Sequence, residues 1–188
     1  MKTLDIDGRK IEVRAFERGD VVAVGQFAAA LPPHDLLFLS RDIQHARVIE
    51  AWAASIADGS IESLIAVDGD KVVATTAIVR DPLGWSPHVA EIRLLVSAEM
   101  RGHGLGRLLL DDSIALAGER GATKLIARMT PDQRGAIALF EESGFRGEAM
   151  LRDHVRDRDG QVFDLAILSL DLRRTRDAKA AWGFASVE

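Results

Sequence analysis

The stretch Arg101-Gly102-His103-Gly104-Leu105-Gly106 lies between an apolar run and an amphipathic run. The run 92–96 predicts a buried strand, and Leu105–Gly118 carries apolar residues at helical spacing. A strand, a glycine-rich turn with an arginine, and a helix together favour anion binding. The reason is that the first N–H groups of a helix lack intrahelical partners and lie at the positive end of its dipole. The stretch therefore predicts a phosphate-binding loop.

The spacing of the glycines narrows the ligand. A dinucleotide-binding turn needs G-x-G-x-x-G, but the third glycine position falls on Arg107 when counted from Gly102 and on Leu109 when counted from Gly104. A glycine followed by Lys and Ser or Thr, which a triphosphate loop needs, is absent from the sequence. The remaining pattern is Arg101-x-x-Gly104-x-Gly106, for which a turn without a ligand stays an alternative.

Two flanking features extend this pattern. Val96 stands five residues before Arg101, and the run 139–145 has the sequence Leu-Phe-Glu-Glu-Ser-Gly-Phe. Upstream of that run, residues 131–136 read Pro-Asp-Gln-Arg-Gly-Ala. Together, from Glu91 to Phe145, these motifs resemble the acetyl-CoA-binding region of the Gcn5-related N-acetyltransferase (GNAT) family.

The resemblance implies an α/β (α+β) fold of the acyl-CoA N-acyltransferase type. It implies a mixed, mainly antiparallel sheet flanked by helices on both faces. The strand that ends at Val96 and the strand Lys124–Met129 are then parallel neighbours that splay apart, and the pantetheine arm lies in the opening. A single domain over residues 1–172 is expected, followed by a tail or short helix over 173–188.

Hydrophobic periodicity and turn residues predict the remaining elements. Asp20 and Ser40 are the expected N-caps of two helices. The expected strands are Lys2–Ile6, Lys10–Phe16, Ile61–Val67, Lys71–Val79, Val89–Val96, Gly147–Val155 and Gln161–Leu170, and the expected helices cover 20–31, 42–57 and 133–142.

The resemblance also implies which residues contact acetyl-CoA. Backbone N–H groups of the loop would bind the pyrophosphate, and N–H groups at a bulge in the preceding strand would polarise the thioester carbonyl. Arg107 either adds charge or is a solvated residue, Gln133 replaces the usual Asn, and Phe140 replaces the usual Tyr and can still pack on the pantetheine. The loop residues are Arg101, Gly102, His103, Gly104, Leu105 and Gly106, and the bulge residues are Leu94, Leu95 and Val96.

Glu91 is the candidate catalytic residue, because the family often has a carboxylate in this strand that accepts the amine proton directly or through a water. A solvent-facing role and a structural ion pair with Arg93 are the alternatives. The chain contains no tyrosine, so a phenol cannot protonate the leaving thiolate. Unassisted departure, water and the nearby Ser143 remain as routes.

Composition limits the partners and the compartment. The chain has 188 residues, of which 47% are hydrophobic, and a formal net charge of −5, which argues against nucleic acid and slightly favours a cationic acceptor. It has no cysteine, no apolar run long enough to cross a membrane, no signal-peptide core and five scattered histidines. We therefore expect no metal, no membrane contact and a cytoplasmic location.

The resulting functional hypothesis is an enzyme that moves an acetyl group from acetyl-CoA to a primary amine of a small molecule or protein, by direct attack in a ternary complex. The alternative is a non-catalytic domain that binds acyl-CoA as a sensor. Acceptor specificity is expected from Leu31–Ser40 and from Arg80–Pro87, which contains Trp85. The apolar run 36–39 is interpreted as part of the core or as a contact of a homodimer, rather than as a wall of the acceptor pocket.

Overall fold

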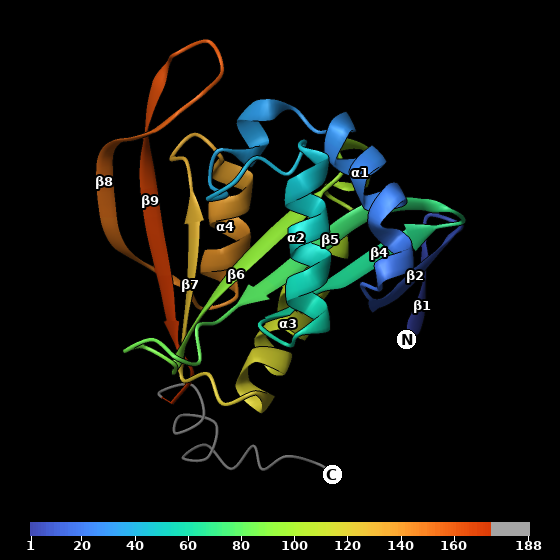
Figure 1. Ribbon diagram of the computed structural model, residues 1–188, viewed down its shortest axis with the longest axis horizontal. Helices are drawn as coiled ribbons and strands as arrows, with labels where there is room; N and C mark the ends of the chain where they lie inside the picture. Colours follow the sequence, from blue (N-terminus) through green and yellow to red (C-terminus); the bar gives the residue numbers. More distant parts are fainter. Residues whose placement is uncertain (174–188) are drawn as a thin grey trace.

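The computed structural model describes residues 1–173 and contains one mixed sheet (Figure 1). Most of its strands form a path in the order β1-β2-β4-β5-β6-β7-β9-β8, while β3 pairs with β5. All described neighbours are antiparallel except β6 and β7, which are parallel. The strands are β1 (Lys2–Ile6), β2 (Arg9–Ala15), β3 (Ile61–Glu62), β4 (Leu64–Asp68), β5 (Lys71–Val79), β6 (Val89–Val96), β7 (Lys124–Met129), β8 (Arg146–Arg156) and β9 (Val162–Asp171).

Helices cover both faces of the sheet. In Figure 1, α1 (Val21–Ala30) and α2 (Ala46–Ala57) lie in front of the sheet, while α3 (Leu105–Glu119) and α4 (Arg134–Glu142) lie behind it. Leu95 of β6 packs into the cluster formed with α1 and α2, whereas Ile92 packs into the cluster formed with α3 and α4. Within residues 1–173 there are also three short 3₁₀ turns, η1 (Arg18–Asp20), η2 (Pro33–Leu36) and η3 (Ala98–Met100). The expected mixed sheet with helices on both faces is confirmed.

The parallel pair β6–β7 separates partway along its length. Its pairing runs from Val89 opposite Lys124 to Glu91 opposite Ile126. Beyond this point β6 stays with β5 as far as Val96, and β7 stays with β9 as far as Met129. The two strands therefore diverge toward their carboxyl ends, as expected, and α4 is visible behind the opening in Figure 1.

Two predicted boundaries were wrong. Helix α2 begins at Ala46 with His45 as N-cap, so Ser40 caps nothing. The preceding turn is fixed instead by Asp42, whose carboxylate accepts a hydrogen bond from the Gln44 N–H. The strand predicted over 61–67 is divided at Ser63, because its carbonyl accepts from the Phe16 N–H and its hydroxyl accepts from Trp52. Hydrogen bonds that the apolar pattern does not encode therefore set both boundaries: a local one at Asp42, and bonds from distant residues at Ser63.

The apolar run 36–39 belongs mainly to the core, as interpreted. Leu36 and Phe38 are buried in the cluster under α1 and α2, and Leu39 packs against that cluster. The predicted tail over 173–188 lies, apart from its first residue, outside the described residues.

Asp20 joins the start of α1 to β2, and its replacement gives a pH-dependent prediction. Both of its oxygens accept bonds of 2.7 Å from Arg14, which hold the pKa of Asp20 below its usual value. A carboxylate with a lowered pKa stabilises the fold above its unfolded pKa, about 3.9, and loses that effect as pH falls through the folded pKa. We expect Asp20→Asn to lower the free energy of unfolding by about 2 kcal/mol at pH 7.

Urea unfolding at pH 7 and below pH 4 measures this effect. The stability gap between the wild type and Asp20→Asn should narrow progressively as the pH falls below about 3.9. Asp159→Asn, at an exposed turn, is the control and should change little at either pH. A gap of the same size at both pH values would contradict the assignment.

Candidate active site

The loop between β6 and α3 presents free backbone donors. Gly102 and Gly104 have φ values of 80° and 83°, which glycine adopts readily, and Gly104 is the N-cap of α3. Among residues 1–173, no group accepts a hydrogen bond from the N–H groups of residues 102–107. A Cβ at Gly102 or Gly104 would meet nothing within 4 Å, so this surface is open to a ligand. Six donors at the start of a 15-residue helix form a cradle that fits a diphosphate.

Gly106 has a packing role in the same loop. A Cβ there would lie 3.4 Å from Leu139 of α4 and 3.6 Å from Val96. The glycine thus lets the first turn of α3 approach β6 and α4 closely, while Leu105 is buried beneath it.

The charged side chains of the loop already have partners. Arg101 donates to the Val96 carbonyl at 3.1 Å and to Asp35 of η2 at 2.6 Å. His103 contacts Asp7 in the β1–β2 turn. Arg107 donates to Ser143 at 3.0 Å and pairs with Glu142, so it is neither free nor solely solvated. These contacts fix the loop against β6, η2 and the end of α4.

The main chain of β6 lines the opening without the bulge that the resemblance implies. Its register with β5 runs without a shift from Glu91 to Val96. The expected bulge is therefore absent, and that prediction was wrong. Main-chain groups of successive strand residues point to alternate sides. The Ser97 N–H bonds to β5, and the His88 carbonyl accepts from the start of β7. Leu94 and Val96 therefore direct their N–H groups toward the β7 side, where pairing has ended, whereas Leu95 directs its N–H group toward β5.

Glu91 lies at the last paired position before the strands separate. It is 8% exposed, so it does not face solvent. Its two oxygens accept hydrogen bonds from Arg93 at 2.9 and 3.2 Å, and Arg128 Nη2 of β7 lies 3.9 Å from Oε2. The ion pair between Glu91 and Arg93, which the sequence left as an alternative, is therefore present. It does not exclude chemistry, because the pair sits where the opening begins.

Arg93 connects this carboxylate to a cavity of about 300 Å³. Figure 1 shows α2 in front of the strands whose residues line the cavity. No residue of Arg80–Pro87 lines it, and Trp85 is fully exposed in that loop. The lining residues are Leu39, Ser40, Arg41, Ile43, Val48, Ala51, Trp52, Ser55, Ile61, Thr75, Ala77, Val79, Arg93 and Leu95.

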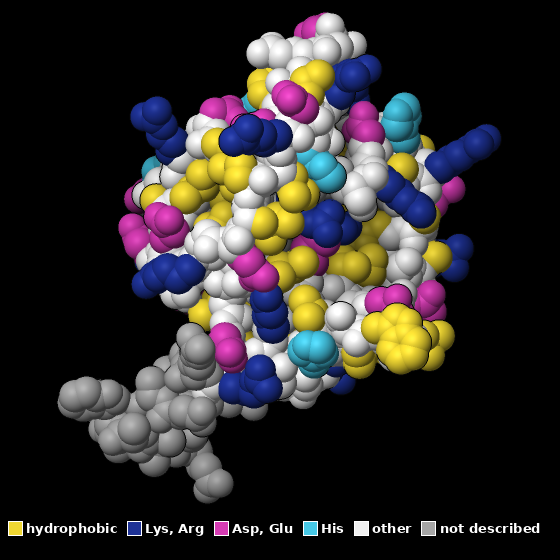
Figure 2. Space-filling model, turned by 90° about the vertical axis from the view of Figure 1, so that its left-hand side faces the viewer, with side chains coloured by type: hydrophobic (Ala, Val, Ile, Leu, Met, Phe, Trp, Pro, Cys, Tyr) yellow, Lys and Arg dark blue, Asp and Glu magenta, His cyan; other side chains and the backbone are white. Residues whose placement is uncertain are grey.

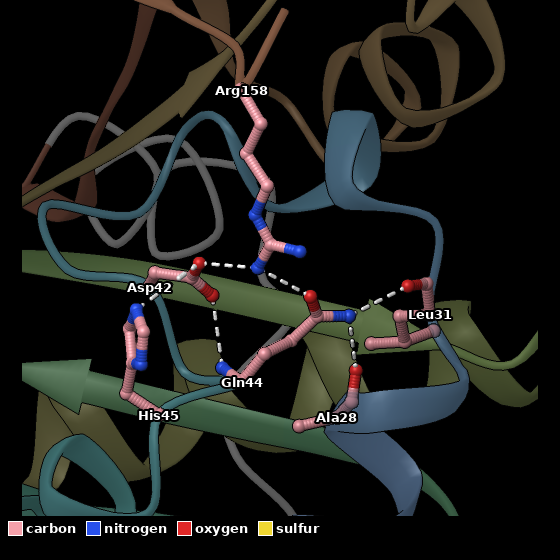
Figure 3. A network of polar contacts seen from close by, with 6 residues as sticks. All are labelled: Ala28, Leu31, Asp42, Gln44, His45 and Arg158. Atoms are coloured by element: carbon pink, nitrogen blue, oxygen red, sulfur yellow. Dashed lines mark hydrogen bonds and ion pairs between the residues drawn. The ribbon is translucent and has the colours of Figure 1, made fainter.

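The loop that borders the cavity is fixed by a contact with the β8–β9 hairpin (Figure 3). Arg158 at the hairpin tip donates to Asp42 at 2.5 Å and to Gln44 at 2.6 Å. Gln44 in turn donates to the carbonyls of Ala28 and Leu31 at the end of α1. Burial acts to raise the pKa of Asp42, but hydrogen bonds from Arg158 and the Gln44 N–H outweigh it and hold that pKa below its usual value.

The other predicted site residues lie in or beside α4. Phe140 is buried at 4% exposure and meets Phe145 edge-to-face with ring centroids 5.0 Å apart. Gln133 turns back on its own loop, since its side-chain oxygen accepts from the Thr130 N–H at 3.3 Å. The Ser143 hydroxyl accepts from Arg107. Sequence reasoning missed Arg41 and Arg128. Arg128 had one signal, its place in the alternation of the predicted strand 124–129, and Arg41 had none.

Three further observations concern membranes, metal ions and charged partners. No helix within residues 1–173 is long and apolar enough to cross a membrane, and no group of three or more potential metal ligands occurs among those residues. On the face shown in Figure 2, basic and acidic side chains are interspersed, so this face carries no continuous basic surface.

Comparison with known proteins agrees with this geometry. The chain is 31% identical over 83 residues to YwnH of Bacillus subtilis (strain 168), assigned as a phosphinothricin acetyltransferase, covering 44% of this chain and 50% of YwnH. The chain spans half or less of the length of the curated relatives it matches.

Solved structures share the fold. An N-acetyltransferase from Staphylococcus aureus Mu50 superposes with a TM-score of 0.75 at 19% identity, covering 86% of this chain and 98% of that one. The Salmonella typhimurium protein yncA, assigned as an acetyltransferase and solved with its cofactor acetyl-CoA, gives 0.74 at 20% identity, covering 86% and 94%. The sequence profile described as the acetyltransferase (GNAT) family matches residues 30–145, so the chain belongs to that family.

Proposed function

We propose that this protein is an N-acetyltransferase that moves an acetyl group from acetyl-CoA to a primary amine by direct attack in a ternary complex. One observation carries the proposal. The N–H groups of residues 102–107, which have no partner within residues 1–173, lie at the end of β6, where the strand has separated from β7. A buried carboxylate lies where that separation begins. A site for a diphosphate, an opening for an extended arm and a candidate proton acceptor are thus aligned along one strand.

The residues present fit the cofactor. The N–H groups of residues 102–107 would hold the pyrophosphate, and Arg101 would add charge at the cost of its bond to Asp35. When bound, acetyl-CoA supplies an acetyl group activated as a thioester. The N–H groups of Leu94 and Val96 would donate to the thioester carbonyl oxygen, where negative charge develops. The family resemblance supports both assignments.

The reaction must release one proton overall. An ammonium acceptor loses a proton before its nitrogen bonds the acetyl carbon. As the C–S bond breaks, the departing sulfur takes one proton and the new amide loses another. Glu91 is the group assigned to accept the amine proton, directly or through a water. Phe140 carries no proton that it could donate. The Ser143 hydroxyl accepts a hydrogen bond from Arg107 and keeps its own O–H, so water and Ser143 are the two candidate donors to the thiolate.

Ligand-dependent thermal stability tests the cofactor assignment. A ligand that binds the folded state alone raises the unfolding temperature, because it stabilises that state by RT ln(1 + L/Kd), where L is the free ligand concentration. Acetyl-CoA and coenzyme A should both stabilise the protein, and NADH should not. Stabilisation by none of the three would reject the cofactor site and with it the proposed activity.

Glu91→Gln tests the catalytic assignment. The amide keeps the shape of the side chain and an acceptor for Arg93, but it cannot take up a proton. We expect kcat to fall by about 10²- to 10⁴-fold, the usual contribution of a general base. Affinity for coenzyme A should differ from that of the wild type by less than about threefold, which is below 1 kcal/mol. The reason is that Glu91 lies at the far end of β6 from the loop.

Thiol release measures turnover, and calorimetry measures coenzyme A binding. Glu50→Gln, on the exposed side of α2, is the matched control and should leave both unchanged. Full turnover by Glu91→Gln would reject its role as base. Coenzyme A binding without turnover by the wild-type protein on any amine would favour the sensor alternative.

A further inference from the structure

The cavity under α2 gives information about the acceptor. Most of its wall is apolar, formed by residues such as Ile43, Trp52 and Leu95. Ser40, Ser55 and Thr75 add hydroxyl groups. A volume of about 300 Å³ suits a molecule of amino-acid size rather than a long polyamine. The acceptor body is therefore expected to be small and largely apolar.

The charged residues that line this cavity are both arginines, Arg41 and Arg93. Within residues 1–173, the Arg41 guanidinium has no ion pair or hydrogen-bond partner. Arg93 uses Nε and Nη2 for Glu91 and Ser40, which leaves Nη1 without a partner in the same part of the chain. Guanidinium groups with free donors bind carboxylates and other oxyanions well.

The surrounding charges do not cancel this excess. Arg128 lies 3.9 Å from Glu91 and has a buried Nε without a partner among the described residues. Asp42, which follows Arg41 directly, is engaged by Arg158 (Figure 3). The guanidinium groups of Arg41 and Arg93 line the cavity, and that of Arg128 lies beside Glu91. These three positive groups outnumber the single carboxylate of Glu91.

The local charge outweighs the net charge of the chain. A net charge of −5 slightly favours a cationic acceptor. Exposed charges further than about 8–10 Å are screened at physiological salt, so the nearby arginines decide what binds in the cavity. A second ammonium group would meet like charge there, whereas an anion would be attracted.

We infer that the acceptor is a small amine that also carries a carboxylate or comparable oxyanion, bound by Arg41 and Arg93, while its amine faces the β6–β7 opening. This inference rests on the proposed function, since it names the substrate class of the same site. Arg41 is a binding residue in this assignment and has no part in the proton transfer assigned to Glu91.

Matched pairs of amines test the inference. Leucine is compared with 3-methylbutylamine, phenylalanine with phenethylamine, and spermidine is added as a polycation. Thiol release at saturating acetyl-CoA gives KM and kcat, and thermal stability of the coenzyme A complex gives binding without turnover. We expect at least one amino acid to have a KM about tenfold or more below that of its decarboxylated partner, equivalent to about 1.4 kcal/mol.

Arg41→Ala should abolish this preference by raising the KM of the amino acid, whereas Arg41→Lys should restore part of it. Arg47→Ala, on the exposed part of α2 outside the cavity, is the matched control and should keep the preference. Coenzyme A affinity should be unchanged in all three variants.

The outcomes separate the two proposals. Amines without a carboxylate that bind and react as well as their amino-acid partners, in wild type and Arg41→Ala alike, would overturn the inference while the proposed function stands. Absence of turnover together with absence of coenzyme A binding would reject the proposed function. Without turnover but with coenzyme A bound, equal stabilisation by both members of every pair would still overturn the inference.

Discussion

Replacing Gly104 by alanine is expected to weaken coenzyme A binding by about tenfold or more. Gly104 has φ of 83°, and an L side chain in that conformation costs about 1–2 kcal/mol. The loop can relieve this strain only by rotating the N–H groups that the α3 N-terminus presents. An added Cβ also occupies open surface that the pyrophosphate would approach closely. Both effects act on the same ligand, and about 1.4 kcal/mol corresponds to tenfold in affinity.

Gly69→Ala is the matched control. Gly69 also has positive φ, 58°, and a Cβ there would likewise meet nothing within 4 Å. It lies in the β4–β5 turn, outside the loop that begins α3. Both variants should unfold more easily by similar amounts, so calorimetric titration with coenzyme A isolates the binding effect. Equal coenzyme A affinity in the two variants would show that the glycine loop is an ordinary turn.

The part of the site that could be predicted is the part encoded by neighbouring residues. The glycines at 102, 104 and 106 specify a turn and a helix start that only a few residues determine. The divergence of β6 and β7 was also expected, but from the family resemblance, because no local pattern states where a strand pair ends. The bulge was expected on the same ground and is absent, since the register of β6 with β5 is continuous.

The rest depends on contacts between distant parts of the chain. Arg158 holds Asp42 and Gln44, although the hairpin and the loop are far apart in sequence. That contact holds the loop that precedes α2 and borders the cavity, and no local pattern in the sequence indicates it. Arg41 has no distinguishing signal in the sequence for the same reason. Its neighbours in the cavity wall come from α2, β3, β5 and β6.

Phe140→Ala is expected to lower the free energy of unfolding by about 3–5 kcal/mol. The ring is 4% exposed and lies in the cluster between the sheet and the helices α3 and α4, edge-to-face with Phe145. Its removal would leave a cavity in a densely packed interior and end that aromatic contact. Urea unfolding measures the loss, and Val22→Ala, where the side chain is 71% exposed, should change stability by less than about 0.5 kcal/mol.

Phe140→Leu then separates core packing from contact with the cofactor. Leucine keeps most of the buried volume, so the protein should stay folded with a smaller loss of stability. Because so little of the ring reaches the surface, coenzyme A affinity should change by less than about threefold, below 1 kcal/mol. A much larger loss of affinity, with stability largely kept, would mean that the ring meets the pantetheine directly. In that case this position would still contact the cofactor without the hydroxyl group that a tyrosine supplies.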